Sequence, residues 1–227
     1  MAQFFTDFSE YATGVTPSDW TQSGSTSESV VVVADAGATG GKIVQFPTEN
    51  NFDRYYLSWD DVGSVSDCEI LVRARLDVES NTSIYIAHAR HDTTSIRDGI
   101  ALEQRGGNVE ILEENNTLSS TGDKWDSNEW FWVRLRVTGA NFKARFWVSG
   151  TEPTTWDTEV TGTDTSSGAV GFGEDNTKNP FEIDVFGVGT AGDAAPSSAP
   201  ATGPNTPINP SVTSLLATSA RLNWEQG

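Results

Sequence analysis

Strict alternation of apolar and polar residues around one glycine turn constrains this chain more than any other feature. Apolar side chains recur at every second position from residue 131 to residue 148, and Gly139-Ala140 interrupts the pattern at its centre. A period of two is that of a β-strand, so the stretch predicts two long antiparallel strands joined by a tight turn. Folding about this turn places Val137 opposite Phe142, and a shift of one residue would oppose apolar to charged side chains. The side chains expected to face the interior are Phe131, Val133, Leu135, Phe142, Phe146 and Val148.

The opposite face of the predicted hairpin mixes tryptophan with basic residues. Tryptophan rings offer flat apolar surfaces to the C–H faces of sugars, and the planar arginine fork binds hydroxyls or carboxylates. This combination indicates a surface for a glycan, an acidic one included, or for a partner chain. The candidate glycan-binding residues are Trp130, Trp132, Arg134, Arg136, Arg145 and Trp147.

A purely structural role for the same face is an open alternative. With an earlier strand, the face gathers six of the fourteen basic residues: Arg73, Arg75, Arg134, Arg136, Lys143 and Arg145. Arg134 is expected directly opposite Arg145, which is destabilising unless carboxylates intervene. In the structural interpretation, Glu103 and Glu110 of a second predicted hairpin lie over or beside the arginines, and arginine stacks on tryptophan.

The overall charge restricts the classes of partner. The chain has 32 acidic and 14 basic residues, for a net charge of −18, whereas nucleic-acid-binding proteins need a basic surface. The single cysteine, Cys68, excludes an intrachain disulfide. The stretch after Met1 lacks the basic start and the apolar run of a signal peptide, so none is expected. No run of residues approaches the roughly 18 apolar residues of a membrane helix.

The remaining patterning of residues 1–189 is also that of short strands separated by turns rich in glycine, asparagine and proline. A second hairpin turns at Gly106-Gly107 and places Leu102 opposite Ile111. No stretch shows helical periodicity. A dozen or so short strands without helices predict one all-β sandwich domain.

Two further segments follow this domain. Residues 190–209 are dominated by proline, alanine, serine and glycine and predict a semi-extended linker. Residues 210–227 resume strand patterning but are too short to close a core of their own. We expect this tail either to anchor the protein on another chain or to be a truncated second domain. The candidate docking residues are Val212, Leu215, Leu216, Leu222 and Trp224.

Three segments of residues 1–190 together resemble the concanavalin A-like lectin/glucanase jelly roll, including laminin-G-like domains. They are the hairpin with its continuation to Trp156, the sequence GAVGFG at 168–173, and FEIDVFGVG at 181–189. The tail resembles the first strands of a fibronectin type III domain. The whole arrangement resembles modular proteins of tailed-phage virions. This resemblance implies a fibre or decoration protein, made in the host cytoplasm and oligomeric on the virion surface, with a lectin-like role in attachment or assembly.

The sequence FEIDVF is the one stretch that resembles a catalytic motif. Laminarinase-type glycoside hydrolases carry E-I-D-x-x-E or E-I-D-x-E on one strand, and Glu182 and Asp184 match the first two acids. Phe186 and Gly187 stand where the general acid is needed. Retaining hydrolysis requires two carboxyl groups, one of them protonated. We therefore expect no catalytic residue and no enzyme; a glycoside hydrolase or lyase acting on a host polysaccharide is the alternative.

Metal ligands are sparse in the sequence. His88 and His91 are the only histidines, and residues three apart on a regular strand point to opposite faces, so they are not expected to share a metal. The family resemblance implies calcium held by loop carboxylates, for which the candidates are Glu174, Asp175 and Asn176. No other cofactor is expected.

Overall fold

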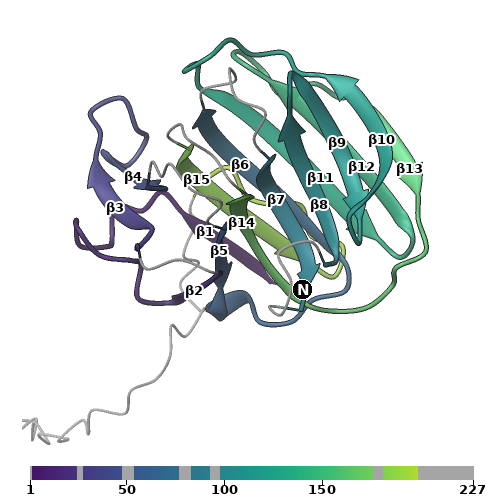
Figure 1. Ribbon diagram of the computed structural model, residues 1–227, viewed down its shortest axis with the longest axis horizontal. Coiled ribbons are helices and arrows are strands. Elements are labelled where there is room, and N and C mark those ends of the chain that lie inside the picture. The colour runs from purple at the N-terminus through teal and green to yellow at the C-terminus, as the bar shows by residue number, and fades with distance from the viewer. Residues whose placement is uncertain are drawn as a thin grey trace, which may run out of the picture.

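The computed structural model describes residues 2–24, 28–47, 54–76, 83–92, 98–175 and 181–198. In these ranges, 15 β-strands and one 3-10 helix, η1 (Asp60–Val62), form a sandwich of two antiparallel sheets (Figure 1). The predicted all-β sandwich is confirmed. None of the helical residues in the described ranges forms an apolar segment of membrane-spanning length.

Sheet A has the strand order β13-β12-β11-β6-β15-β4-β3, and β1 also pairs with β15. The long strand β15 is therefore central. It pairs with β6 along one edge, while β4 and β1 share the other edge. The strands of sheet A are β1 (Gln3–Thr6), β3 (Val31–Ala34), β4 (Lys42–Gln45), β6 (Cys68–Leu76), β11 (Phe131–Thr138), β12 (Asn141–Trp147), β13 (Thr158–Thr161) and β15 (Phe181–Thr190).

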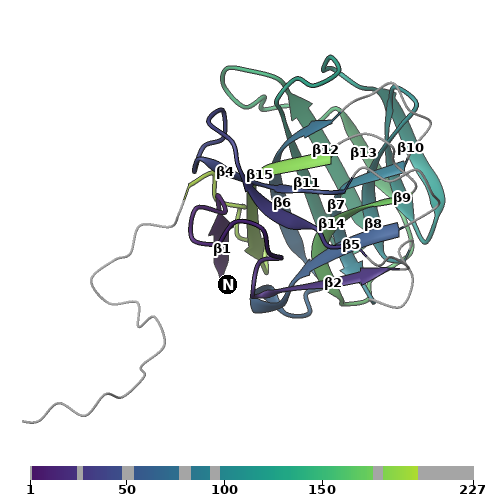
Figure 2. The same cartoon turned by 60° about the vertical axis from the view of Figure 1, so that its left-hand side comes forward.

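Sheet B has the strand order β10-β9-β8-β7-β14-β5-β2, and Figure 2 shows these strands side by side. Its outer edges are β10 and β2, so the hairpins of the middle of the chain lie at one side and the early strands at the other. The strands of sheet B are β2 (Trp20–Gly24), β5 (Arg54–Trp59), β7 (Ser83–His91), β8 (Ile100–Arg105), β9 (Asn108–Glu113), β10 (Asn116–Gly122) and β14 (Ala169–Asp175).

The core between the sheets contains the predicted face of the β11–β12 hairpin. Val137 pairs with Phe142 and Val133 pairs with Phe146, as the alternation predicts. These side chains are fully buried, and Val148, just beyond β12, is half-buried against the same core. Alternation and a glycine turn were sufficient to predict this hairpin, because only one register buries the apolar side chains of both strands.

The second hairpin also has its predicted register but not its predicted neighbours. Glu103 of β8 pairs with Glu110 of β9. Both strands belong to sheet B, whereas the arginine-rich face belongs to sheet A. The expectation that these glutamates cover the arginines is therefore wrong. Alternation fixes which residues share a face, but it does not show which sheet a hairpin joins.

Strand β7 departs from regular alternation. The pairing of β7 with β14 shifts twice, and Arg90 has a positive φ of 59°. This bulge turns His88 and His91 to the same side, with ring centroids 4.7 Å apart. The prediction that they point to opposite faces is therefore wrong. Across the described ranges, no group of three histidine, cysteine or acidic side chains is placed to hold a metal.

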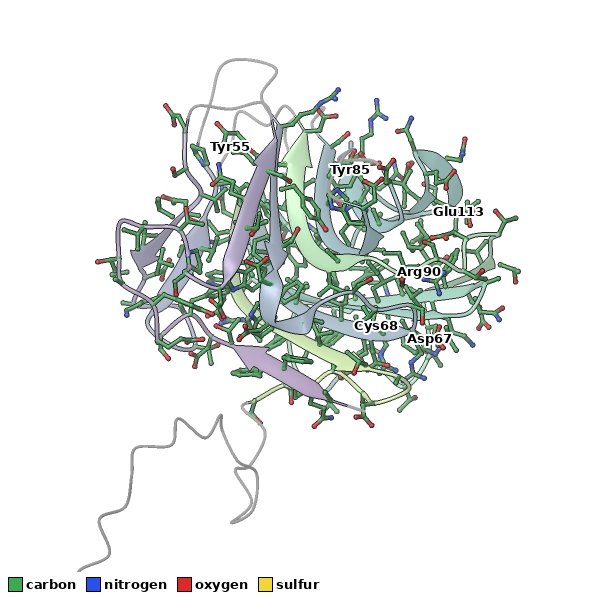
Figure 3. The ribbon with its side chains drawn as sticks, turned by 90° about the horizontal axis from the view of Figure 1, so that it is seen from below. Tyr55, Asp67, Cys68, Tyr85, Arg90 and Glu113 are labelled. Carbon is green, nitrogen blue, oxygen red and sulfur yellow. The ribbon has the colours of Figure 1, made fainter. Side chains whose placement is uncertain are left out.

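The unusual backbone at Arg90 is stabilised by its own side chain. The guanidinium is fully buried and donates to the carbonyls of Ser66 and Gly139, at 2.7 Å each, and to that of Asp164. Figure 3 shows Arg90 in the same region as Asp67 and Cys68. The Arg90 side chain thus connects three loops at one end of the sandwich. These hydrogen bonds stabilise the bulged backbone of β7 at Arg90.

Residues 191–198, the start of the segment predicted as a linker, pack against the outer face of sheet A. We call them the strap. The Ala195 amide donates to Glu69 at 3.2 Å, and its carbonyl accepts from Arg134 at 3.0 Å. A Cβ on Gly187 would lie 2.3 Å from the Pro196 carbonyl oxygen, so the strap passes close to β15 only because Gly187 has no side chain. The rest of the linker and the docking residues Val212, Leu215, Leu216, Leu222 and Trp224 lie outside the described residues.

Candidate functional site

The tryptophan and arginine residues predicted to share a face do so, on the outer side of sheet A. Trp132 of β11 pairs directly with Trp147 of β12. Their rings are nearly parallel, with an interplanar angle of 6° and centroids 6.0 Å apart, and both side chains are partly exposed. Because each strand projects its side chains perpendicular to the sheet, two tryptophans opposite each other stand as a pair of flat apolar plates.

The tryptophan pair borders a depression of about 240 Å³. We call this depression the Trp pocket. The floor and walls come from three parts of the chain: strands of sheet A, the β12–β13 loop and the strap. Its lining residues are Leu71, Trp132, Trp147, Gly150, Glu152 and Ser197. Of these, Leu71, Gly150, Glu152 and Ser197 were not predicted, because only the pairing of β6 with β11, the folded loop and the strap bring them to the tryptophans.

The arginines beside the pocket are paired with carboxylates. Arg134 is only 5% exposed and binds Glu152 through two N–H groups, at 2.5 and 2.8 Å, and also binds Glu69. Arg145 binds the same Glu152, and Arg136 binds Glu69. The opposition of Arg134 and Arg145 across the hairpin is therefore tolerated because one carboxylate lies between them.

Two further tryptophans on this face are covered by arginine. The guanidinium carbons of Arg73 and Arg75 lie 4.8 and 4.5 Å from the ring centroid of Trp130. Arg145 lies 4.4 Å from the ring centroid of Trp156. Cation–π contacts of this kind position both partners. Trp130, a predicted glycan-binding residue, does not line the Trp pocket, and Trp156 orients Arg145, which in turn holds Glu152.

The residues of the FEIDVF stretch have structural partners in sheet A. Asp184 is fully buried and accepts from the Thr39 amide at 2.7 Å and from Arg73. Glu182 binds Arg75 at 2.5 Å. Phe186 lies in the core, edge-on to Trp20. Both acids are therefore paired with arginines, and a phenylalanine occupies the position of the missing acid.

Of the residues predicted for calcium, the two that the structure describes, Glu174 and Asp175, point to opposite sides of β14. Glu174 faces the core with both carboxyl oxygens buried and without a hydrogen-bond partner, and burial raises its pKa to about 9. Its neighbour Asp175 points to the other side of β14 and binds Arg54 at 3.1 Å. Asn176 lies outside the described residues. Calcium takes six to eight oxygens, and the described part of this trio supplies one uncommitted carboxyl group.

A separate aromatic cluster lies on sheet B. Tyr56 stacks on His91 with centroids 3.8 Å apart and contacts His88 edge-on. Burial, and secondarily His91, lowers the pKa of His88 to about 3. His88 Nε2 donates to the Asp98 carbonyl, and its ring stacks with that of Tyr85. The His88 imidazole is therefore neutral at pH 7 and packs as an aromatic ring.

Comparison of the sequence with protein-family models and with curated proteins yields no match. Solved structures do match the fold. The exoplasmic/lumenal domain of VIP36 in its Ca2+-bound form is 10% identical, with a TM-score of 0.56 over 83% of this chain and 89% of that one. A protein of unknown function from Shewanella oneidensis MR-1, SO2946, is 14% identical, with a TM-score of 0.54 over 82% and 85% of the two chains.

A third similar structure is the carbohydrate binding module CBM66 from Bacillus subtilis. It is 12% identical, with a TM-score of 0.50 over 73% of this chain and 92% of that one. At these identities the likeness concerns the fold. The protein has the concanavalin A-like jelly-roll architecture, and its Trp pocket has to be interpreted from its own residues.

Proposed function

We propose that this protein is a non-catalytic carbohydrate-binding module and that the Trp pocket is its saccharide site. The observation that carries the proposal is the parallel pair of Trp132 and Trp147 beside the carboxylate of Glu152. Binding sites for small molecules combine apolar and aromatic surface with a few fixed polar groups. The pocket has both: the tryptophans stand on paired strands, and Glu152 is held by Arg134 and Arg145.

The tryptophan pair restricts how a sugar could bind. Two rings whose centroids are 6.0 Å apart leave no room for a sugar ring between them, because each contact needs about 3.5–4.0 Å. A sugar therefore lies against an outward face of the pair, with its hydroxyls toward Glu152 and Ser197.

Similar structures support the proposal at the level of the fold. VIP36 has been solved with mannose and with Man3GlcNAc, in both cases with Ca2+, and CBM66 is named as a carbohydrate binding module. VIP36 has also been solved in a metal-free form. The Trp pocket itself needs no metal, because tryptophan faces and hydrogen bonds are sufficient to hold a neutral saccharide.

The biological setting that we propose is attachment or assembly on a virion surface. Its support is the sequence pattern of a jelly roll followed by a proline-rich segment and a strand-like tail. The absence of catalysis is part of the proposal. It is supported by the ion-paired states of Glu182 and Asp184 and by the burial of Phe186.

Trp147→Ala tests the proposed site. We expect this variant to lose 2 kcal/mol or more of glycan binding, about 30-fold, because it removes a central aromatic contact. Binding is measured on an array of immobilised glycans, with thermal melting as the check on folding. Trp130→Ala is the matched control, since it removes a tryptophan from the same face but outside the pocket.

Equal binding by the wild type and the Trp147→Ala variant would refute the pocket as the saccharide site. A soluble-glycan turnover assay tests the enzymatic alternative. Release of reducing ends that disappears in Glu182→Gln would replace the binding module with a glycoside hydrolase.

A further inference from the structure

The arginine-rich face of sheet A carries no surplus of positive charge. Its six cations are Arg73, Arg75, Arg134, Arg136, Lys143 and Arg145. Each is ion-paired, and the carboxylates that pair with them also number six: Asp35, Glu69, Glu152, Glu159, Glu182 and Asp184. Six positive and six negative charges leave the face neutral, although in the sequence it resembles a binding surface for anions.

The remainder of the protein strengthens this conclusion. Subtracting these six pairs from the 32 acidic and 14 basic residues leaves 26 acidic and 8 basic residues elsewhere. A polyanionic chain that approaches the Trp pocket therefore meets a neutral face on a strongly negative molecule. It would also have to displace Glu152 from Arg134 and Arg145 before it could use their forks.

Glu152 is held in place by donors from both hairpin strands. Arg134 donates twice to it and Arg145 donates once, and Arg134 is itself fixed by Glu69 and by the strap carbonyl of Ala195. A carboxylate has about four acceptor sites, so these three donors leave about one. The side chain of Glu152 is 27% exposed and lines the pocket, so this remaining site is accessible to a ligand.

We propose, building on the saccharide site above, that the Trp pocket selects neutral glycans and that Glu152 is its specificity-determining residue. Its free acceptor site takes a hydrogen bond from a sugar hydroxyl. Its negative charge offsets the positive charges of Arg134 and Arg145, together with Glu69 on Arg134, and repels glycans that carry carboxylate or sulfate groups. Charge-assisted hydrogen bonds of this kind add orientation as well as affinity.

The experiment uses the full chain on an array that contains neutral and acidic glycans, at about 50 mM and about 500 mM salt, because salt screens only ionic attraction. We expect the wild type to bind neutral glycans equally at both salt concentrations and to bind acidic ones weakly. Glu152→Gln keeps the shape of the side chain but removes its charge. This variant should lose about tenfold or more in affinity for neutral glycans, as expected for a hydrogen bond to a charged group, and gain salt-sensitive binding of acidic ones.

Glu159→Gln is the matched control. It removes one negative charge from the same face, at the pair with Lys143, but outside the pocket. An equal gain of acidic-glycan binding in both variants would assign the effect to overall charge and overturn the role of Glu152. Glu152→Gln also weakens the ion pairs of Arg134 and Arg145. The salt dependence of glycan binding by the wild type is therefore an independent test of neutral selectivity.

The outcomes separate this inference from the proposed function. Wild-type binding of acidic glycans that falls with salt and disappears in Trp147→Ala would refute neutral selectivity and retain the site. Glycan binding unaffected by Trp147→Ala, or no binding to either class of glycan, would refute both.

Discussion

The buried carboxyl group of Glu174 should make the stability of the protein depend on pH. Because its pKa is raised by burial from 4.5 to about 9, the folded protein keeps this proton where the unfolded chain has released it. The resulting stabilisation is complete below pH 4.5 and is lost as the pH rises toward 9. The free energy of unfolding should fall by about 1.4 kcal/mol per pH unit across this window, before other groups are added.

Replacing Glu174 with glutamine should remove this slope, because glutamine cannot ionise. We expect the Glu174→Gln variant to match the wild type near pH 4.5 and to be more stable at pH 8. Urea unfolding at both pH values, with EDTA present, measures the difference. Glu110→Gln on sheet B controls for the loss of one negative charge.

A stability difference that does not change with pH would contradict this account of Glu174. The same variant also tests the calcium prediction. If added calcium stabilises the wild type but not the Glu174→Gln variant, Glu174 is a calcium ligand.

At the scale of elements, the β11–β12 hairpin is the best-specified part of the fold. Phe146 is fully buried opposite Val133 and lies edge-on to Trp125, with ring centroids 5.8 Å apart. Phe146→Ala should therefore reduce the free energy of unfolding by roughly 3–5 kcal/mol, because the cavity left by the ring cannot be filled by its neighbours. Chemical denaturation measures this loss.

Val148→Ala serves for comparison, since Val148 is only half-buried and lies just beyond the end of the same strand. Its loss should be clearly smaller than that of Phe146→Ala. If the two variants lose the same amount, the ring of Phe146 does not fill the core as described.

The hairpin could be predicted from sequence because its signals are local. Alternation, a glycine turn and the cost of a register shift all lie within residues 131–148. The bulge in β7 could not be predicted in this way. The positive φ of Arg90 depends on the carbonyls of Ser66, Gly139 and Asp164, which are distant in the chain.

The candidate site was predictable to the same extent. The neighbouring positions of Trp132 and Trp147 follow from the hairpin register, and so does the opposition of Arg134 and Arg145. The carboxylate that separates these arginines comes from a loop, and the strap completes the pocket wall. Neither Glu152 nor Ser197 has a local pattern that would place it there, so the sequence indicated the cations without their partners.

At the scale of the whole molecule, the strap shortens the reach of the predicted linker. Residues 191–198 are packed on sheet A, so the remaining linker, residues 199–209, would span at most about 34 Å if polyproline-like. If residues 210–227 anchor the protein to the proposed virion, deleting them should abolish its incorporation into virus particles and leave its melting temperature unchanged. Quantifying the protein in purified particles tests this.

A longer truncation that removes residues 191–227 is the comparison. It should also lower the melting temperature, because Glu69 and Arg134 lose their strap partners. Full incorporation of protein lacking only residues 210–227 would rule out the anchor.

The central position of β15 has a consequence for biosynthesis. Of the described strands, β15 leaves the ribosome last, yet β6, β4 and β1 all need it as a partner. Until residue 190 emerges, the edges of these strands remain open and able to pair with other nascent chains. Most pairings in this sandwich also join distant parts of the chain, which slows folding. The yield of folded protein should therefore depend on chaperones and on low temperature during synthesis, and a stop codon before residue 181 should give aggregates instead of a smaller sheet.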